Sequence, residues 1–460
     1  MDATSGCVAI ASLLGLYSGG EISLYLFLML PARIFKLLLI LALCVPGSGC
    51  GTRDDTGGKT VLRLGYMADQ RNQAFIKVLL ETFHAKHPDI EVDPVFATGH
   101  YEQKITTMLA GGDPLDLFMV STFRLAEYAE RNTLLELDSF AENDAEFQAA
   151  ARDIFPAALE DAEYGGRAYR MPFWTNAIVL YYNKDHFDAA GLAYPDDTWT
   201  WNDLLAACKE LTRDEDGDGR FDQYALYAPL SMWFFGGLSD YIRQHDAQLF
   251  SEDMSECLID SPDVLEAIRF WYDLALVHKA IPSPLGADKR FENSEESFMT
   301  GRLAMTITGR WSMKIFEKAD FEWSLAPLPR GKVRYVPIGN AHMAASRKTK
   351  HPEACWTFLK FLVSEEAQQL ITEVKTECPV RISVAESDLF RNGYGRQQEN
   401  DVIIKELRRA SPIPTFPGQG EWLDFCRPEL DEVLLGRQTL EEAARKIKKQ
   451  YAKIRAEHGL

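Results

Sequence analysis

Residues 61–120 alternate short apolar segments with amphipathic ones, and this alternation restricts the fold more than any other feature of the sequence. The apolar segments have the length and composition of strands, and the segments between them place apolar residues on one helical face. Strands are expected at 61–65, 90–96 and 115–120, and helices at 74–86 and 105–109. This order predicts an α/β fold in which a right-handed parallel sheet carries helices on both faces.

The same kind of alternation continues towards the C-terminus. Further strands are expected at 177–182, 303–308 and 335–345, and helices near 201–212, 262–279, 292–300, 352–364, 365–373, 421–435 and 439–456. A chain of 460 residues is too long for one compact core, so its length predicts two or three domains or lobes. Apolar residues make up 46% of the chain, which is enough to fill such cores.

The charge and the cysteines argue against several classes of function. The 68 acidic residues outnumber the 49 basic ones, which leaves a formal net charge of −19. A nucleic acid or an anionic membrane surface would require clustered Lys and Arg, so neither is expected as the main partner. The eight cysteines form neither a C-x-x-C pair nor a Cys/His ligand spacing, so a zinc site and a thioredoxin-like motif have no support.

The N-terminal segment has the features of an export signal. A stretch with two basic residues precedes the apolar run 37–45, and small residues follow at 47–49. The run is shorter than the roughly 20 residues that cross a membrane, so residues 1–49 are interpreted as a signal peptide. We expect Met29 to be the true start and residues 1–28 to be a spurious extension. A genuine additional hydrophobic segment is the alternative.

Cys50 directly follows the small residues, and this arrangement resembles the lipobox of bacterial lipoproteins. The resemblance implies that Cys50 becomes the lipidated first residue of the mature chain, with residues 50–59 as its tether to the membrane. Gly47 departs from the usual Leu, and simple signal cleavage is the alternative. Five cysteines would then remain in an oxidising compartment, so at most two disulfides are expected.

Six groups of residues along the chain carry a resemblance to a known family. They are A-G-G-D-P-L-D-L-F at 110–118; G-G-R-A-Y-R-M-P at 165–172 with L-Y-Y-N-K at 180–184; G-L-A-Y-P at 191–195 with Thr198 and Trp199; F-M-T-G-R-L-A-M at 298–305 with G-R-W at 309–311; H-P-E-A at 351–354 with F-L-K-F-L at 358–362; and G-R-Q-T-L-E-E-A at 436–443. In this order they resemble the extracellular solute-binding proteins of the sugar-binding type, the family of maltose-binding protein.

The resemblance implies a two-lobed periplasmic-binding-protein fold of type II, with a hinge between α/β lobes and the ligand in the cleft. Lobe one is expected over 60–176 plus 340–375, and lobe two over 177–339 plus 376–460. The implied function is that of the substrate-binding component of an ABC-type sugar importer. The protein is then expected to be a monomeric lipoprotein, anchored to a membrane in the periplasm or at the cell surface. It closes on a mono- or oligosaccharide and delivers it unchanged to a permease. Catalysis and a required cofactor are not expected.

A sugar presents apolar faces and a rim of hydroxyl groups, so its site needs aromatic rings for stacking and planar polar groups for hydrogen bonds. At the positions that the resemblance picks out, the aromatic and amide candidates are Trp174, Asn176, Trp233, Trp311 and Trp422. Open parallel sheets bind ligands beyond strand ends or at crossings, and the candidates there are Tyr66, Asp69, Gln70, Ser121, Thr122, Arg310, Gly339, Asn340 and Arg381. The two arginines leave the charge of the ligand open. Trp199 and Asp116 are expected to be structural.

Residues 214–222 read D-E-D-G-D-G-R-F-D, and carboxylates at alternate positions before a Gly match the first half of a calcium-binding loop. The candidates for a structural calcium site are Asp214, Asp216, Asp218, Arg220 and Asp222. Position twelve of the loop is Ala225 rather than Glu, so the bidentate ligand is missing. A solvated acidic turn is the alternative.

Two other functions stay open on the sequence. An exported glycosidase or polysaccharide lyase would also need Trp-lined clefts, together with paired carboxylates. The chain contains no G-x-S-x-G, H-E-x-x-H or P-loop motif, but acids can be brought together in space. The same fold could instead bind a glycerol phosphate, a polyamine or a peptide.

Overall fold

The computed structural model describes residues 58–67, 70–97, 99, 101–111, 115–232, 235–282, 289–291, 293–375 and 377–459. Within it, Lys59–Leu460 forms one compact unit. The predicted signal peptide, Cys50, Asp69 and Trp233 lie outside the described residues, and Gln70 is described only by its backbone. Among the described residues, no helix combines the length and hydrophobicity that a membrane-crossing segment requires.

The first sheet contains the strands that the alternating segments predict. Its order is β2-β1-β3-β11-β6, with β1 (Thr60–Met67), β2 (Ile90–Ala97), β3 (Leu117–Met119), β11 (Ile338–Ala345) and β6 (Arg170–Ala177). Strand β1 pairs in parallel with β2 and β3, as predicted. The prediction of a wholly parallel sheet is wrong, because β11 runs antiparallel to both β3 and β6. Strand β6 therefore runs in the same direction as β1, β2 and β3, and β11 alone enters the sheet from its other end.

Helices cover the first sheet. They include α3 (Gln70–Lys86), α4 (Tyr101–Gly111), α5 (Thr122–Glu130), α6 (Asp138–Asn143), α7 (Ala145–Ala151), α8 (Pro156–Glu160), α15 (Pro352–Leu362) and α16 (Glu365–Val374), with a small hairpin of β4 (Glu163–Tyr164) and β5 (Arg167–Ala168).

Asp116, expected to be structural, accepts hydrogen bonds from the Arg63 amide at 2.9 Å and the Thr349 hydroxyl at 2.6 Å. That expectation is confirmed.

The second sheet has the order β10-β7-β9-β8, with β10 (Trp323–Ala326), β7 (Val179–Asn183), β9 (Leu303–Thr308) and β8 (Tyr224–Tyr227). Strands β8 and β9 are parallel, and the other pairs are antiparallel. Both faces of β7 are buried: Val179 and Tyr181 join one hydrophobic core, and Leu180 and Tyr182 join the other. Alternate residues of a strand point to opposite faces, so one apolar run serves two cores.

The remaining helices pack around the second sheet or follow it. They are α9 (Lys184–Ala190), α10 (Trp201–Leu211), α11 (Leu238–Gln244), α12 (Pro262–Leu276), α13 (Ser294–Met299), α14 (Met313–Phe316), α17 (Ile382–Ala385), α18 (Asp388–Arg391), α19 (Gln397–Arg409), α20 (Gln419–Leu434) and α21 (Leu440–Glu457). Helix α10 begins with the Thr200/Asp203 capping box, which confirms the structural reading of this segment around Trp199. Helix α19 was not predicted, and it packs against both β6 and β10.

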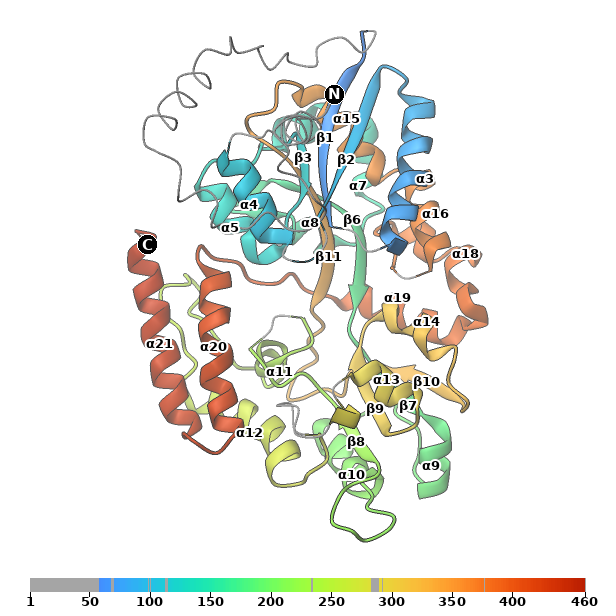
Figure 1. Ribbon diagram of the computed structural model, residues 1–460, viewed down its shortest axis with the longest axis vertical. Helices are drawn as coiled ribbons and strands as arrows, with labels where there is room; N and C mark the ends of the chain where they lie inside the picture. Colours follow the sequence, from blue (N-terminus) through green and yellow to red (C-terminus); the bar gives the residue numbers. More distant parts are fainter. Residues whose placement is uncertain are drawn as a thin grey trace, which may run out of the picture. The chain divides into compact units, whose positions relative to one another are not determined.

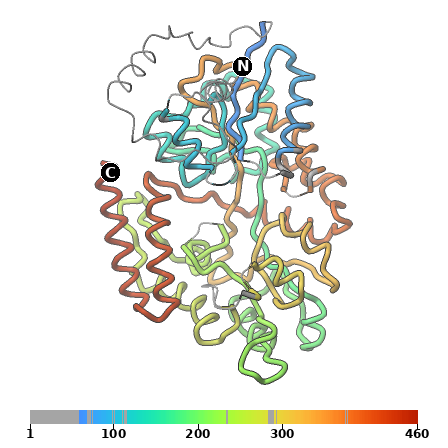
Figure 2. Tube along the Cα trace, in the orientation of Figure 1, coloured from blue at the N-terminus to red at the C-terminus, as the bar shows by residue number. Residues whose placement is uncertain are grey.

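Several segments connect the two sheets. The chain leaves β6 and enters β7 through the single residue Ile178, and it returns from the second sheet to the first in β11. Figure 1 and Figure 2 show β6 and β11 running side by side between the sheets. Cys378 pairs with Thr175 of β6, and Ser411 pairs with Pro337 next to β11. The predicted lobe boundaries themselves stay a prediction.

Candidate ligand-binding site

A cavity of about 420 Å³ lies at one edge of the second sheet. Strands β8 and β9 are parallel, so their carboxyl ends, Tyr227 and Thr308, lie at the same edge. This is where open sheets with parallel strands bind ligands. The start of α13 and the turn before α11 complete the wall, and the lining residues are Ile178, Tyr227, Pro229, Phe235, Gly236, Asn293, Ser294, Glu295, Ile307, Thr308 and Trp311.

Two aromatic rings dominate this cavity. The rings of Phe235 and Trp311 lie with their centroids 5.9 Å apart at an angle of 45°. Each ring lies over a glycine: a Cβ atom at Gly309 would be 2.1 Å from the Trp311 ring, and one at Gly339 would be 2.1 Å from the Phe235 ring. The absence of side chains at these two positions therefore makes room for the aromatic pair. Both rings are only partly buried, so part of each is accessible to a ligand.

The polar part of the cavity is ordered by hydrogen bonds. The Ser312 hydroxyl donates to Glu295 Oε1 at 2.5 Å and lies 2.8 Å from the Thr308 hydroxyl. Asn293 caps α13 by accepting from the Glu296 amide at 3.0 Å. Burial raises the pKa of Tyr227, so its phenol stays neutral and can donate a hydrogen bond. The wall thus offers a fixed carboxylate, an amide and the three hydroxyl groups of Tyr227, Ser294 and Thr308.

The structure brings Trp311 and Gly339 of the predicted residues to this site. Trp311 lines the cavity, and Gly339 lies under the ring of Phe235 rather than facing the cavity. Sequence reasoning missed Phe235, Glu295 and Thr308. Thr308 ends the predicted strand 303–308, so the rule about strand ends would have found it, whereas no signal in the sequence marks the other two.

Trp422 does not reach the surface of the molecule. Its side chain is 0% exposed and packs in the second core against Phe250, Phe416 and Tyr451, with ring centroids 5.4 to 6.1 Å away. The prediction that it stacks on a ligand is wrong for this structure, because no face of the ring is accessible. Tyr66 is likewise 0% exposed, inside the first core beside Phe96. Its predicted contact with ligand is also wrong.

Arg310 has a structural role instead of the predicted contact with ligand. The guanidinium is 0% exposed, and its Nη1 donates to the carbonyl oxygens of Lys375 at 2.8 Å and Glu377 at 2.9 Å. It also lies 4.4 Å from the centroid of the Phe390 ring. Arg310 therefore fastens the end of β9 to the segment after α16. The helical turn that starts at residue 310 sends this side chain inward and the next one, Trp311, into the cavity.

Asn176 and Arg381 also hold the connecting segments. Asn176 is buried and donates to the Glu377 carboxylate. Arg381 Nε donates to Asp153 Oδ2 at 2.8 Å, within the layer of the first sheet. Their predicted contacts with ligand stay predictions.

Thr122 and Asn340 converge on a buried carboxylate that sequence reasoning did not select. Asp161 Oδ2 accepts from the Thr122 hydroxyl at 3.1 Å and from Asn340 Nδ2 at 3.2 Å, and it lies 3.7 Å from the Arg170 guanidinium. Asp161 Oδ1 accepts from the Ile413 amide at 3.4 Å. Burial raises the pKa of Asp161 and lowers that of Arg170 to about 10, so the guanidinium remains protonated at neutral pH. This cluster joins β6, β11, α5 and the segment before α20.

The roles of two further candidates stay predictions. Trp174 is half-buried against Phe75 and Phe173, with ring centroids 6.4 Å and 4.1 Å away. Ser121 is partly exposed at the N-cap of α5. Neither residue lines the cavity at the second sheet.

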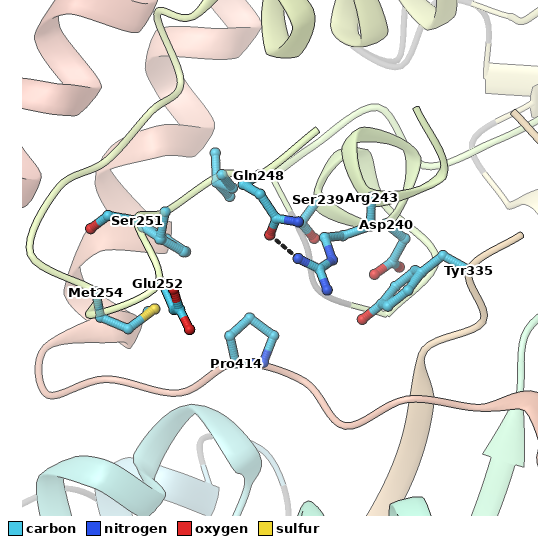
Figure 3. A pocket seen from close by; sticks show the side chains of 11 residues that line it. Ser239, Asp240, Arg243, Gln248, Ser251, Glu252, Met254, Tyr335 and Pro414 are labelled. Carbon is cyan, nitrogen blue, oxygen red and sulfur yellow. Dashed lines mark hydrogen bonds between the residues drawn. The ribbon is translucent and has the colours of Figure 1, made fainter. Parts of the chain in front are cut away.

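A second cavity, of about 260 Å³, is lined by residues of α11 and of the segment that follows it. Figure 3 shows Asp240 and Arg243 of α11 beside Tyr335, with Pro414 below them in this view. The Arg243 guanidinium lies 5.5 Å from the centroid of the Tyr335 ring and donates to Gln248. Two polar side chains of this cavity, Arg243 and Gln248, are thus engaged with each other.

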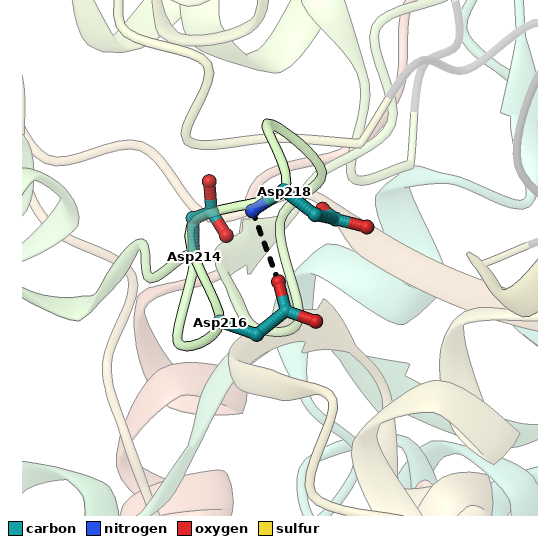
Figure 4. Close-up of side chains that lie close together, drawn as sticks. All are labelled: Asp214, Asp216 and Asp218. Carbon is teal, nitrogen blue, oxygen red and sulfur yellow. Dashed lines mark hydrogen bonds between the residues drawn. The ribbon is translucent and has the colours of Figure 1, made fainter.

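The acidic loop brings three carboxylates together. Oxygens of Asp214, Asp216 and Asp218 all lie within 4.8 Å of one another, and Figure 4 shows the three side chains around the turn. Asp214 accepts from the amides of Gly217 and Gly219, each at 2.9 Å. Asp222, predicted as a further ligand, accepts from the Glu215 amide at 2.9 Å. Arg220 lies in the same turn, where its amide donates to Asp218 at 2.7 Å.

The cysteines of the described residues are unpaired. Cys208, Cys257, Cys355, Cys378 and Cys426 are buried free thiols. They therefore behave as small apolar residues in the core.

Comparison with known proteins identifies the family of the chain. Residues 68–369 match the model of the bacterial extracellular solute-binding proteins. The match covers more than half of the sequence. The chain belongs to this family.

Relatives of this solute-binding protein agree with the assignment. The maltodextrin-binding protein MdxE of Bacillus subtilis is 22% identical over 411 residues, which is 86% of this chain and 90% of the relative. The maltotriose-binding protein of Pyrococcus abyssi is 24% identical over 368 residues, or 77% and 73% of the two chains. The ABC substrate-binding protein Lmo0181 of Listeria monocytogenes, solved with cycloalternan, is 25% identical with a TM-score of 0.76 and covers 87% of this chain and 100% of that one.

These comparisons confirm the predicted fold class and family. The solved relative belongs to the two-lobed α/β substrate-binding proteins, as expected for a type II fold. The family and the relatives are binding proteins. Because the family is extracellular, the solute-binding protein is exported.

Proposed function

We propose that this solute-binding protein captures a neutral sugar or oligosaccharide in the cavity at the second sheet and delivers it to the permease of an ABC importer. The observation that carries the proposal is the pairing of Trp311 and Phe235 beside a row of hydrogen-bonding groups. Flat rings match the apolar faces of a pyranose, and the polar row matches its hydroxyl rim. The three relatives described above are named for, or solved with, maltodextrin, maltotriose and cycloalternan.

Each part of the wall has a role in this proposal. Trp311 and Phe235 stack on the ligand, and Glu295 accepts hydrogen bonds from its hydroxyl groups. Thr308 and Tyr227 both donate and accept. Contacts from groups of the first sheet to the same ligand would favour the closed form, so binding shifts the population of the two lobes towards closure. No bond of the ligand is broken.

The charge of the lining favours a neutral cargo over the alternatives. Of the lining residues, only Glu295 carries a formal charge, and it is negative, so a phosphorylated ligand would find no cation there. The two predicted arginines that could hold a phosphate are engaged elsewhere: Arg310 with backbone carbonyls and Arg381 with Asp153. Glycoside hydrolysis would use a pair of carboxylates, and this lining supplies one.

A thermal-shift screen tests the proposal. The mature protein is heated with a panel of neutral mono- and oligosaccharides, sn-glycerol 3-phosphate and spermidine. A ligand that binds only the folded state raises the melting temperature by mass action, so at least one neutral carbohydrate is expected to do so. A shift with the phosphate or the amine alone would contradict the cargo assignment, and chemical change of the bound carbohydrate, followed by mass spectrometry, would contradict the binding-protein role.

Replacing Gly339 by alanine should weaken carbohydrate binding by about tenfold or more, because the new methyl group and the Phe235 ring cannot occupy the same space. The ring must move away from Trp311, which separates the stacking pair. Titration calorimetry with the carbohydrate found in the screen measures the loss. Gly111→Ala is the matched control, because a Cβ there meets nothing within 4 Å. Equal affinity of the two variants would show that Phe235 is not part of the site.

Lipid anchoring through Cys50 is part of the proposal. A lipidated cysteine would keep the binding protein next to its permease after export. Expressed with its own signal in a bacterial host, the protein is expected in the membrane fraction, and Cys50→Ala is expected in the soluble fraction. Immunoblotting of the two fractions measures the difference. An unaltered protein that is entirely soluble would support simple signal cleavage.

We also propose that the acidic loop holds calcium, with Asp214, Asp216 and Asp218 as its carboxylate ligands. The closeness of the three carboxylates supports this, because calcium prefers hard oxygen ligands. Addition of 1 mM calcium to chelator-treated protein is then expected to raise the melting temperature by about 2–4 °C. Asp216→Asn should reduce this shift, and magnesium at the same concentration is the control. No shift with calcium would identify the loop as a solvated turn.

A further inference from the structure

The turn that carries Phe235 into the ligand cavity is held from behind by α11. Residues 235–237 precede this helix, and the carboxylate of Asp240 accepts hydrogen bonds from the amides of both Gly236 and Gly237, the latter at 3.2 Å. Asp240 is 1% exposed. It lines the second cavity (Figure 3) and not the cavity at the second sheet.

A second side chain of α11 holds the same peptide unit. The Tyr241 hydroxyl donates to the carbonyl oxygen of Gly236 at 3.0 Å. The ring of Tyr241 is itself fixed, because it stacks on Trp271 with centroids 3.7 Å apart and planes inclined by 13°. Two consecutive, buried residues of α11 therefore hold Gly236: Asp240 accepts from its amide, and Tyr241 donates to its carbonyl oxygen.

The backbone of the turn has little freedom to place Phe235 elsewhere. Gly236 has a φ of +86°, which strongly favours glycine and defines the direction in which the preceding residue leaves the turn. From there the Phe235 ring reaches over Gly339 and meets Trp311. Because the ring already lies on Gly339 of β11, a shift of the turn would press the ring against this strand or open a gap beside Trp311.

We propose that Asp240 and Tyr241 are positioning residues for ligand binding: they hold Gly236 and thereby set the place of the Phe235 ring in the site. Neither residue lines the ligand cavity. The expected effect on affinity rests on the proposed function. The hydrogen bonds of Asp240 and Tyr241 to the turn, called the clamp below, are a property of the free protein.

A purely structural reading would make Asp240 only the capping residue of α11. An Asp at the third helical position that accepts from the N-cap amide stabilises a helix in many proteins. That reading gives no role to the Tyr241 hydroxyl, which is not part of the cap, and it predicts no effect on Phe235. The two readings therefore differ in what Tyr241→Phe does.

The experiment uses Tyr241→Phe, Asp240→Leu and Asp240→Asn in the full mature chain. Tyr241→Phe keeps the ring on Trp271 and removes only the hydroxyl, and Asp240→Asn keeps an oxygen that accepts from both glycine amides. The position of the turn is followed by fluorine NMR with 4-fluorophenylalanine incorporated at position 235, which requires no ligand. Affinity for maltotriose, the probe ligand, is measured by calorimetry in each variant and in each variant combined with Phe235→Ala.

The expected result has two parts. The fluorine signal shifts or broadens in Tyr241→Phe and Asp240→Leu and stays as in the unaltered protein in Asp240→Asn. Affinity falls about three- to tenfold in the first two variants, and this loss disappears in the Phe235→Ala background, because the clamp then has no ring to position. Asp240→Asn keeps the affinity of the parent.

Two results would overturn the inference. One is an unchanged fluorine signal in Tyr241→Phe, and the other is a loss of affinity that is equally large with and without Phe235. If Asp240→Leu does not fold, Tyr241→Phe still decides both points. Absence of maltotriose binding by the unaltered protein counts against that sugar as its cargo, and the fluorine signal then decides the clamp by itself.

Discussion

Replacing Trp311 by alanine is expected to lower the affinity for the carbohydrate by about one hundredfold. A pyranose that stacks on the indole buries roughly 100 Å² of apolar surface, which at about 25 cal/mol per Å² corresponds to ~2.5 kcal/mol. Trp311 also supports the ring of Phe235, so its removal loosens the second stacking group. Calorimetry at constant pH and salt measures the change.

Trp199→Ala provides the control for this prediction. Trp199 is half-buried against Phe187, with ring centroids 6.0 Å apart, and it does not line the cavity. We expect Trp199→Ala to lower the free energy of unfolding and to leave the affinity of the folded protein for the carbohydrate unchanged. If Trp311→Ala binds the carbohydrate as well as the parent does, the cavity at the second sheet is not the binding site, and the proposed function loses the observation that carries it.

The largest loss of stability is expected for Asp161→Asn. This change removes one charge of a wholly buried pair and leaves the protonated, buried Arg170 guanidinium without the carboxylate beside it. Removing one partner of a buried ion pair typically costs about 3–5 kcal/mol of unfolding free energy. Urea denaturation followed by intrinsic fluorescence measures the loss as a lower midpoint.

A double variant separates the charge from the packing. In Asp161→Asn combined with Arg170→Met no charge is left unpaired, so the double variant should be more stable than Asp161→Asn alone. If the two changes simply add, the pair does not interact in the way that the structure indicates. Because Asp161 also accepts from Asn340 and Ile413, the single variant should additionally loosen the links between the sheets.

Much of the fold was predictable because it depends on local patterns. Strand β9 was predicted at residues 303–308 and is found there, because its short run of mostly apolar residues is typical of a strand that is buried along its whole length. The antiparallel entry of β11 was not predictable, because the direction of a strand in a sheet depends on where a distant segment arrives. Helix α19 was missed because its burial depends on contact with both β6 and β10.

In the candidate site, too, the sequence indicated which residues to consider, and long-range contacts decided their roles. Residues 310 and 311 were both selected, since they follow a strand end, but only the structure shows that Trp311 faces the cavity while Arg310 holds backbone carbonyls. Trp422 was selected on the resemblance and is enclosed by three aromatic rings. Successive side chains of a helix differ in direction by about 100°, and this rotation decides which of them faces a cavity. The identity of the residues alone does not give this direction.

The sequence by itself determined the class of the protein: the α/β alternation and the ordered motifs of the solute-binding family are local or nearly local features. The tertiary structure alone decided which side chains meet. Phe235 stands beside Trp311, and Asp161 collects donors from four separate segments, because chain parts far apart in sequence pack together. Burial and direction of a side chain depend on these long-range contacts, so they are fixed only when the whole chain has folded.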